Sequence, residues 1–144
     1  MTMNYFAYGA NMNLKHMKQL CGNHAKVVGP AQLLHYEWGL NKKGFANVYP
    51  NQIRNTWGVL FEIDDFALKG IDNFEGYPSE YDRKEDFVVN VFGKTVTAMF
   101  YFQADQSFGG KPAEDYITRI IEGAVENNLP REWVTKLEGY KISK

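Results

Sequence analysis

The chain of 144 residues lacks the features that mark several specialised classes of protein. Its single cysteine, Cys21, excludes an internal disulfide framework and fits a reducing compartment. A formal net charge of −1 gives no electrostatic argument for nucleic acid or an anionic membrane surface as a partner. No apolar run reaches membrane-spanning length, and the N-terminus lacks a signal-peptide pattern. We therefore expect a single domain over residues 1–144 and a cytoplasmic location.

The motifs of several common catalytic centres are also missing. The three histidines, His16, His24 and His35, form no HxxxH or HxH pattern, and no pair of carboxylates has the spacing of a metal site. Cys21 has no patterned histidine partner, and no G-x-S-x-G elbow is present. The glycines of a dinucleotide fingerprint and the lysine of a P-loop are absent. These patterns indicate neither a metal nor a nucleotide cofactor.

The chain does contain strand patterns, with a few helix patterns between them. We expect strands in 3–8, 27–40 (one strand or two), 45–49, 56–63, 87–91 and 95–102, the last two forming a hairpin. We expect helices in 14–20, in 65 to about 74, in 113–127, and from 130 through 137 to near 139. Strands joined mostly by turns predict an α+β fold with an antiparallel or mixed sheet, open or closed into a small barrel.

The helix patterns also predict which side chains are buried. In the segment that Asp64 caps, we expect Phe66, Ile71 and Phe74 to face inward. The predicted helix 113–127 carries an apolar stripe of Tyr116, Ile117, Ile120, Ile121, Ala124 and Val125. These stripes are no larger than the core of a monomer requires, so they leave the oligomeric state open.

The stretch from Tyr5 to Met12 reads as an apolar strand that stops at Gly9 and turns directly into a helix, which Asn11 or Asn13 can cap. Such a turn leaves main-chain N–H groups unpaired. At the positive end of a helix dipole these groups hold a carboxylate or a phosphate well. The turn is therefore a candidate anion site, although many turns of this kind bind nothing.

Two further side chains are candidates for chemistry. Glu75 lies between Phe74 and Tyr77 at a helix C-terminus, where desolvation and the helix dipole would both raise its pKa toward the range useful for proton transfer. The alternative is a solvated glutamate at a helix end. Tyr116, at the start of a helix, either reaches a site at the mouth of a barrel or is a tyrosine at the rim of the core.

Four short motifs occur in order along the chain. They are Tyr8-Gly9-Ala10-Asn11-Met12; Trp57-Gly58-Val59; Ile71-Asp72-Asn73-Phe74-Glu75-Gly76 with Tyr81 after it; and Pro112-Ala113-Glu114-Asp115-Tyr116, which opens a helix ending in Gly123-Ala124-Val125-Glu126-Asn127-Asn128-Leu129-Pro130. Together they resemble the γ-glutamylcyclotransferase family, which includes the AIG2-like and BtrG-like proteins. The resemblance runs from residue 5 to about residue 137. Ala10 stands where the family usually has serine.

The resemblance implies a small, mixed and mostly antiparallel six-stranded β-barrel with helices packed outside it. It also implies a small-molecule γ-glutamyl substrate, an amide that its own α-amine cyclises to 5-oxoproline. The reaction releases an amine or an amino acid, and it is described as acyl transfer or as a cyclising lyase reaction. No metal or organic cofactor is implied.

Carried over position by position, the family's site falls on the N-terminal loop and two side chains. The loop residues are Tyr5, Phe6, Ala7, Tyr8, Gly9 and Ala10, whose N–H groups would face the α-carboxylate of the glutamyl group. Glu75 would be the general acid/base, Tyr116 would line the pocket, and Tyr81 matches a family tyrosine near the site. Two alternatives share these features: a γ-glutamylamine cyclotransferase in a biosynthetic route, and a non-catalytic module that binds a small carboxylate, which Ala10 favours.

Overall fold

The computed structural model describes residues 2–142, and within this range five strands close into one barrel. The strands are β1 (Thr2–Ala7), β2 (Ala25–Leu40), β3 (Ala46–Asp64), β4 (Asp82–Val89) and β5 (Thr95–Phe102). The helices are α1 (Leu14–Cys21), α2 (Asp65–Glu75), α3 (Glu114–Glu126) and α4 (Arg131–Ile142), with the short 3-10 helices η1 (Ala10–Met12) and η2 (Gly22–His24). This α+β barrel with helices outside confirms the predicted fold class.

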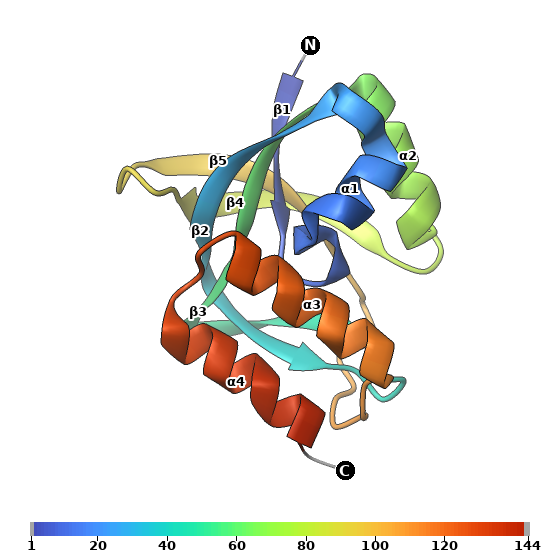
Figure 1. The fold of residues 1–144 in the computed structure, drawn as a ribbon, viewed down its shortest axis with the longest axis vertical. Helices are drawn as coiled ribbons and strands as arrows, with labels where there is room; N and C mark the ends of the chain where they lie inside the picture. Colours follow the sequence, from blue (N-terminus) through green and yellow to red (C-terminus); the bar gives the residue numbers. More distant parts are fainter. Residues whose placement is uncertain (1, 143–144) are drawn as a thin grey trace.

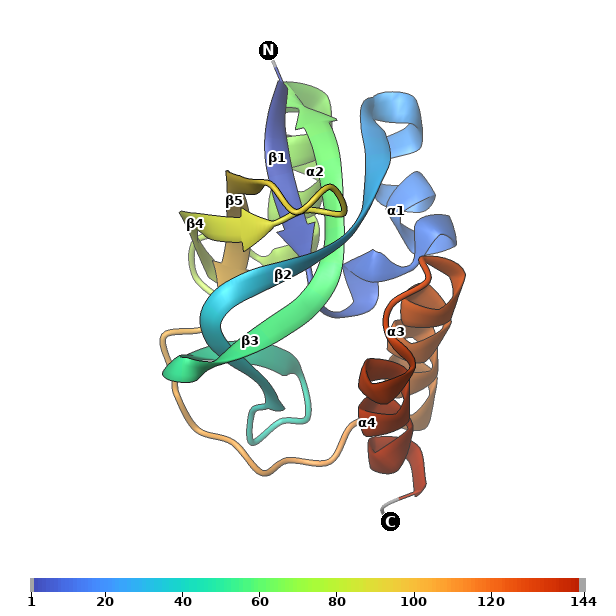
Figure 2. The same cartoon turned by 90° about the vertical axis from the view of Figure 1, so that its left-hand side faces the viewer.

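The barrel is mixed but mostly antiparallel, as predicted. Its strand order is β1-β3-β2-β4-β5, and only the contact that closes it, between β1 and β5 at Tyr5 and Met99, is parallel. β1 runs antiparallel to the C-terminal part of β3, and β4 and β5 form the predicted hairpin. Figures 1 and 2 show α1 and α2 beside the start of β1, while α3 and α4 lie side by side along another part of the barrel.

The predicted count of six strands is wrong, because two predicted strands are one. Segments 45–49 and 56–63 both belong to β3, which pairs with β2 along one long hairpin. The register of this hairpin shifts between Val27 and Gly29 and again between Leu34 and Tyr36. Such β-bulges bend and twist a strand without ending it. Two long, bent strands therefore replace the three or four shorter strands that were expected over residues 27–63.

The inward face of α2 differs from the predicted one. Phe66 and Phe74 are 63% and 45% exposed, so their predicted burial is wrong, whereas Ile71 is fully buried as expected. The buried line of the helix instead runs through Ala67 and Ile71, which are four residues apart and stack on one face. One more step of four along this line reaches Glu75, so the helix turns that carboxyl toward the body of the protein.

Helix α3 packs against η1 and fixes the turn that follows β1. Ile117 and Ile120 are buried as predicted, whereas Val125 is 56% exposed, so its place on the buried stripe was wrong. A Cβ added at Gly123 would lie 2.7 Å from the main-chain carbon of Met12, which shows how closely the two backbones approach. None of the helices in residues 2–142 has the length and apolar character needed to cross a membrane.

Candidate active site

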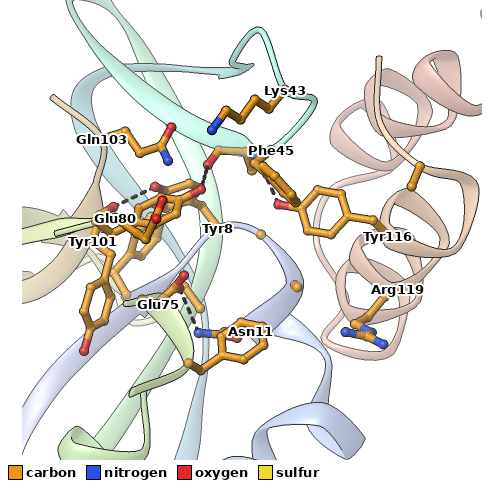
Figure 3. Close-up of a pocket in the computed structure, with 18 of the residues that line it drawn as sticks. Tyr8, Asn11, Lys43, Phe45, Glu75, Glu80, Tyr101, Gln103, Tyr116 and Arg119 are labelled. Atoms are coloured by element: carbon orange, nitrogen blue, oxygen red, sulfur yellow. Dashed lines mark hydrogen bonds between the residues drawn. The ribbon is translucent and has the colours of Figure 1, made fainter. Parts of the chain in front are cut away.

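A pocket of about 510 Å³ opens where the loop after β1 meets α2 and α3 (Figure 3). All eight residues that the sequence analysis assigned to a site line it: Tyr5, Phe6, Ala7, Tyr8, Gly9, Ala10, Glu75 and Tyr116. Tyr81 lines it too. The structure thus brings together segments that are up to about one hundred residues apart in the chain, while the role of each residue stays a prediction.

Glu75 enters the pocket from the last turn of α2. Gly76 follows it in the left-handed conformation and caps the C-terminus of α2, because its N–H donates to main-chain oxygens of that helix. Surrounding protein desolvates the carboxyl, and this burial raises its pKa from 4.5 to about 7. A carboxyl with such a pKa is present in both protonation states near neutral pH, so it can both accept and donate a proton.

The loop from Tyr8 to Asn11 lines the pocket. Within residues 2–142 the N–H groups of Gly9, Ala10 and Asn11 have no hydrogen-bond acceptor. The loop is nevertheless held firmly, because Trp38 Nε1 donates to the Tyr8 carbonyl at 2.8 Å and the Tyr8 hydroxyl donates to the Tyr101 carbonyl at 2.6 Å. Fixed, unpaired N–H groups are suited to an anionic ligand.

Two tyrosines bind the main chain of one residue of β3, Ala46, which lies close to Gly9 of the loop. The Tyr116 hydroxyl accepts the Ala46 N–H at 2.9 Å, and the Tyr81 hydroxyl donates to the Ala46 carbonyl at 3.0 Å. Burial raises the pKa of Tyr116 to about 12, so its hydroxyl keeps its proton at neutral pH. The Tyr116 hydroxyl donates to no acceptor within residues 2–142, so its proton is available to a ligand.

The sequence analysis missed Asn11 as a residue of this pocket. It considered Asn11 only as a helix cap, and the structure gives that role to Asn13, whose side chain accepts the His16 N–H at 3.1 Å. The Asn11 side-chain amide instead donates to Glu75 Oε2 at 3.2 Å (Figure 3). Its place in the first motif could have indicated a role in the site, but only the fold shows that its amide binds Glu75.

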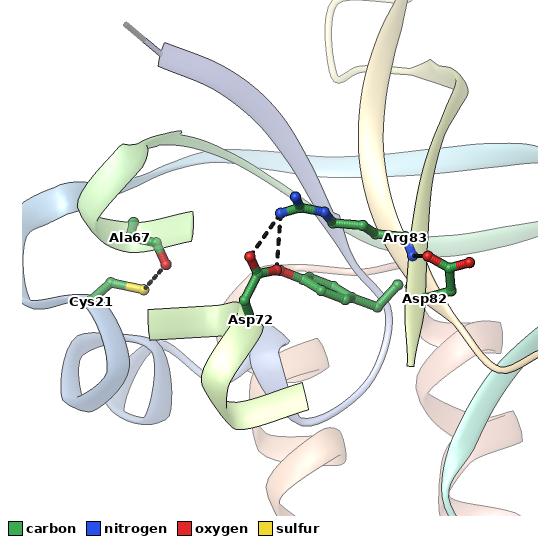
Figure 4. A network of polar contacts seen from close by, with 6 residues as sticks. Cys21, Ala67, Asp72, Asp82 and Arg83 are labelled. Carbon is green, nitrogen blue, oxygen red and sulfur yellow. Dashed lines mark hydrogen bonds and ion pairs between the residues drawn. The ribbon is translucent and has the colours of Figure 1, made fainter. Parts of the chain in front are cut away.

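A second polar group supports one wall of the pocket from behind. Asp72, on α2, pairs with Arg83 at 2.9 Å and accepts the Tyr101 hydroxyl at 2.6 Å (Figure 4). Arg83 also lies over the ring of Tyr77, 4.1 Å from its centre. The pair ties β4 and β5 to α2 and so fixes Tyr101, whose ring lines the pocket and packs edge-on against Tyr5.

Charged side chains of both signs also line the pocket. They are Lys43, Glu80, Asp115 and Arg119, and the sequence analysis proposed a role for none of them. Within residues 2–142, no three histidine, cysteine, aspartate or glutamate side chains gather in a way that could hold a metal ion. The pocket lining combines the Glu75 carboxyl, tyrosine hydroxyls, the main chain of the loop and these four charged side chains.

Comparison with known proteins points to one family. The family model described as "Gamma-glutamyl cyclotransferase, AIG2-like" matches residues 5–119. The γ-glutamylcyclotransferase of Homo sapiens is 28% identical over 145 residues, which cover 93% of this chain and 76% of the human protein. That of Bos taurus is also 28% identical, over 144 residues that cover 92% of this chain and 76% of the bovine protein.

The solved structures agree with the sequence matches. One titled "Gamma-glutamyl cyclotransferase" superposes with a TM-score of 0.86 at 25% identity, covering 96% of this chain and 87% of that chain. The region that the family model matches includes both the loop after β1 and Glu75, and it ends at Arg119 on α3. Because the family model matches most of its length, the chain belongs to the γ-glutamylcyclotransferase, AIG2-like family.

Proposed function

We propose that this protein cyclises a γ-glutamyl amide to 5-oxoproline and releases an amine or an amino acid, with Glu75 as general acid/base. The observation that carries the proposal is the meeting of Glu75 and the Tyr8–Asn11 loop in one pocket. A carboxyl with a pKa near 7 shares this pocket with main-chain N–H groups that have no acceptor within residues 2–142. The same pocket thus offers both a base and a place for a carboxylate.

The chemistry begins at the α-amino group of the substrate. This group is protonated at neutral pH and cannot attack until Glu75 takes its proton. The freed amine then attacks the γ-carbonyl carbon, and the resulting tetrahedral intermediate collapses with cleavage of the bond to the departing nitrogen. Glu75 returns this proton to the departing nitrogen, which leaves as a neutral amine. The ring nitrogen then gives up its second proton, which Glu75 passes to the released amine, so that 5-oxoproline and an ammonium group result and the carboxyl ends the cycle as it began. No covalent bond to the protein forms.

The pocket contributes mainly through geometry. The attack is intramolecular, so the glutamyl chain must be folded into a ring-like conformation before it reacts. Fixing such a conformation is worth up to roughly 7–11 kcal/mol in favourable cases. The loop N–H groups would hold the α-carboxylate, and the free proton of Tyr116 is a candidate donor to the oxyanion, an effect of about 3 kcal/mol for a well-placed donor.

The test is an assay for 5-oxoproline with two substrate classes, γ-glutamyl amino acids and γ-glutamyl amines. Glu75→Gln keeps the shape of the side chain but cannot transfer a proton, so we expect turnover to fall at least about a hundredfold. Glu85→Gln is the matched control, because Glu85 is an exposed glutamate on β4 that is not part of the pocket lining.

Each result separates the alternatives. Product from one class would identify the leaving group. Full turnover by Glu75→Gln would contradict the proposed acid/base role. No product from either class by folded protein, together with tight binding of 5-oxoproline, would favour a non-catalytic module that binds a small carboxylate.

A further inference from the structure

The carboxyl of Glu75 has one hydrogen-bond partner within residues 2–142, and that partner is Asn11. Asn11 Nδ2 lies 3.2 Å from Glu75 Oε2 and 2.8 Å from the hydroxyl oxygen of Tyr5, so its two N–H bonds each have an acceptor. The Asn11 side chain is nearly enclosed, at 3% exposed. The side chain therefore has little freedom to adopt another orientation, and its hydrogen bond to Glu75 is held in place.

The other end of the same amide is unpaired. Asn11 Oδ1 is buried and has no hydrogen-bond partner. Leaving a buried carbonyl unpaired is unfavourable, and native structures rarely do so without a reason. Turning the amide over would place its oxygen against Glu75, which is repulsive whenever that carboxyl is ionised. In the observed orientation the amide N–H binds the Glu75 carboxyl, while the amide oxygen is left without a partner. This orientation suits the ionised form of the carboxyl.

The backbone of Asn11 is fixed from the opposite side. Asn127 Nδ2, at the end of α3, donates to the Met12 carbonyl at 2.8 Å, and Gly123 allows α3 to approach η1 closely. The short helix η1 is buried along its whole length. The position of Asn11 is therefore set by α3, while the position of Glu75 is set by α2, and their side chains join the two at the pocket.

We propose that Asn11 is a positioning residue for Glu75: its amide holds Oε2, favours the ionised carboxylate, and leaves Oε1 to meet the α-amino group of the substrate. The role of Oε1 rests on the proposed function. The hydrogen bond and its effect on the carboxylate do not, because they can be measured without substrate.

Other titratable groups also face Glu75, and they must be separated from Asn11. The tyrosines are Tyr5 and Tyr8 from β1 and the loop after it, Tyr81 before β4, Tyr101 from β5 and Tyr116 from α3. Burial raises the pKa of each, so all five stay neutral in the range where Glu75 titrates. The charged groups around the pocket are Lys43, Glu80, Asp115 and Arg119, and no substitution at Asn11 changes them.

The experiment is a ¹³C NMR titration of the Glu75 side-chain carboxyl in protein labelled at glutamate, with Glu75→Gln to assign the signal. Asn11→Leu removes the donor at similar side-chain volume, so water gains little access. Since a hydrogen bond to a charged group is worth about 1.5–3 kcal/mol, we expect the titration midpoint to rise by about one unit or more from its value near 7. An unchanged midpoint in folded Asn11→Leu would overturn the proposal.

Two further variants guard against a fault in folding or packing. Asn11→Asp keeps the shape and places a second carboxyl beside Glu75, so it should raise the higher midpoint of the pair more than Asn11→Leu does. Tyr5→Phe removes the other acceptor of Asn11 but keeps the bond to Glu75, so it should shift the midpoint less than Asn11→Leu. Equal shifts in Tyr5→Phe and Asn11→Leu would assign the effect to packing and refute the proposal.

Kinetics then separate this inference from the proposed function. In Asn11→Leu the acid limb of kcat/KM for 5-oxoproline formation should move upward with the NMR midpoint, and kcat should fall more than KM rises. A midpoint shift without any turnover in the wild-type protein would support the Asn11–Glu75 bond and reject the cyclotransferase proposal. A midpoint shift with an acid limb that does not follow it would refute the role of Asn11 in catalysis.

Discussion

Replacing Glu75 by glutamine should stabilise the folded protein in neutral and alkaline solution while it removes turnover. The reason is the free-energy cost of keeping the ionised carboxyl away from water in the folded protein. Its pKa is about 7 in the folded state, against an ordinary value of 4.5, and burial is the cause. Glutamine has nearly the same shape, and its side-chain oxygen can still accept the N–H of Asn11, but it carries no charge to desolvate.

The sign and size follow from proton linkage. Below about pH 4.5 the carboxyl is protonated in both the folded and the unfolded chain, so it contributes no pH-dependent difference. Between that pH and about 7, the folded state retains a proton that the unfolded state has released, so stability falls as the pH rises. Above 7 both states are ionised, and the folded state carries the whole penalty, of about 3 kcal/mol for the difference between the two pKa values.

The measurement is the free energy of unfolding by urea, for the wild-type protein and Glu75→Gln, at several values between pH 4.5 and pH 8.5. We expect the two proteins to be similar at the acid end and the variant to be more stable by up to about 3 kcal/mol at the alkaline end. Glu85→Gln serves as the control for removing one exposed carboxylate. A constant difference between wild type and Glu75→Gln across this range would refute the argument that burial perturbs Glu75.

Two further predictions test the support of the pocket. Gly123→Ala should lower the free energy of unfolding by roughly 1–3 kcal/mol, because its new Cβ would lie 2.7 Å from main-chain atoms of Met12 and Asn13; urea unfolding measures this. Tyr116→Phe should lower kcat/KM about tenfold or more, because it removes the free hydroxyl proton and the acceptor of the Ala46 N–H. Unchanged kinetics in Tyr116→Phe would remove Tyr116 from the site, and unchanged stability in Gly123→Ala would contradict the tight approach of α3 to η1.

Local signals in the sequence predicted the individual elements well. The side chain of Asp64 caps α2 as expected, accepting the Ala67 N–H at 3.0 Å, and the turn after β2 closes through a hydrogen bond from Gly44 to Asn41. Caps and turns depend on residues that are close in the chain, so their chemistry can be read from the chain. The turns between strands predicted an antiparallel or mixed sheet, and the family resemblance implied the mostly antiparallel barrel that the structure has.

Features set by packing between distant segments were not predictable in the same way. Phe66 and Phe74 were expected inside because they are large and apolar, but the chain buries Ala67 and Ile71 and turns Glu75 inward instead. Phe66 packs on the ring of His24 and Phe74 on that of His16, both outside the helix. A pattern of period 3.6 identifies a helix, yet which of two overlapping apolar faces is buried depends on the partner that covers it.

Ala10 stands where the family usually has serine, so this position offers no hydroxyl that could bind Glu75. In the structure the partner of Glu75 is the next residue along, since Asn11 donates to Glu75 Oε2. Ala10 is itself 7% exposed, and what it offers the pocket is an unpaired N–H and a small side chain. A main-chain donor is the same whichever residue stands at position 10, so the two contacts that the proposed mechanism requires of this loop remain with Ala10 in place.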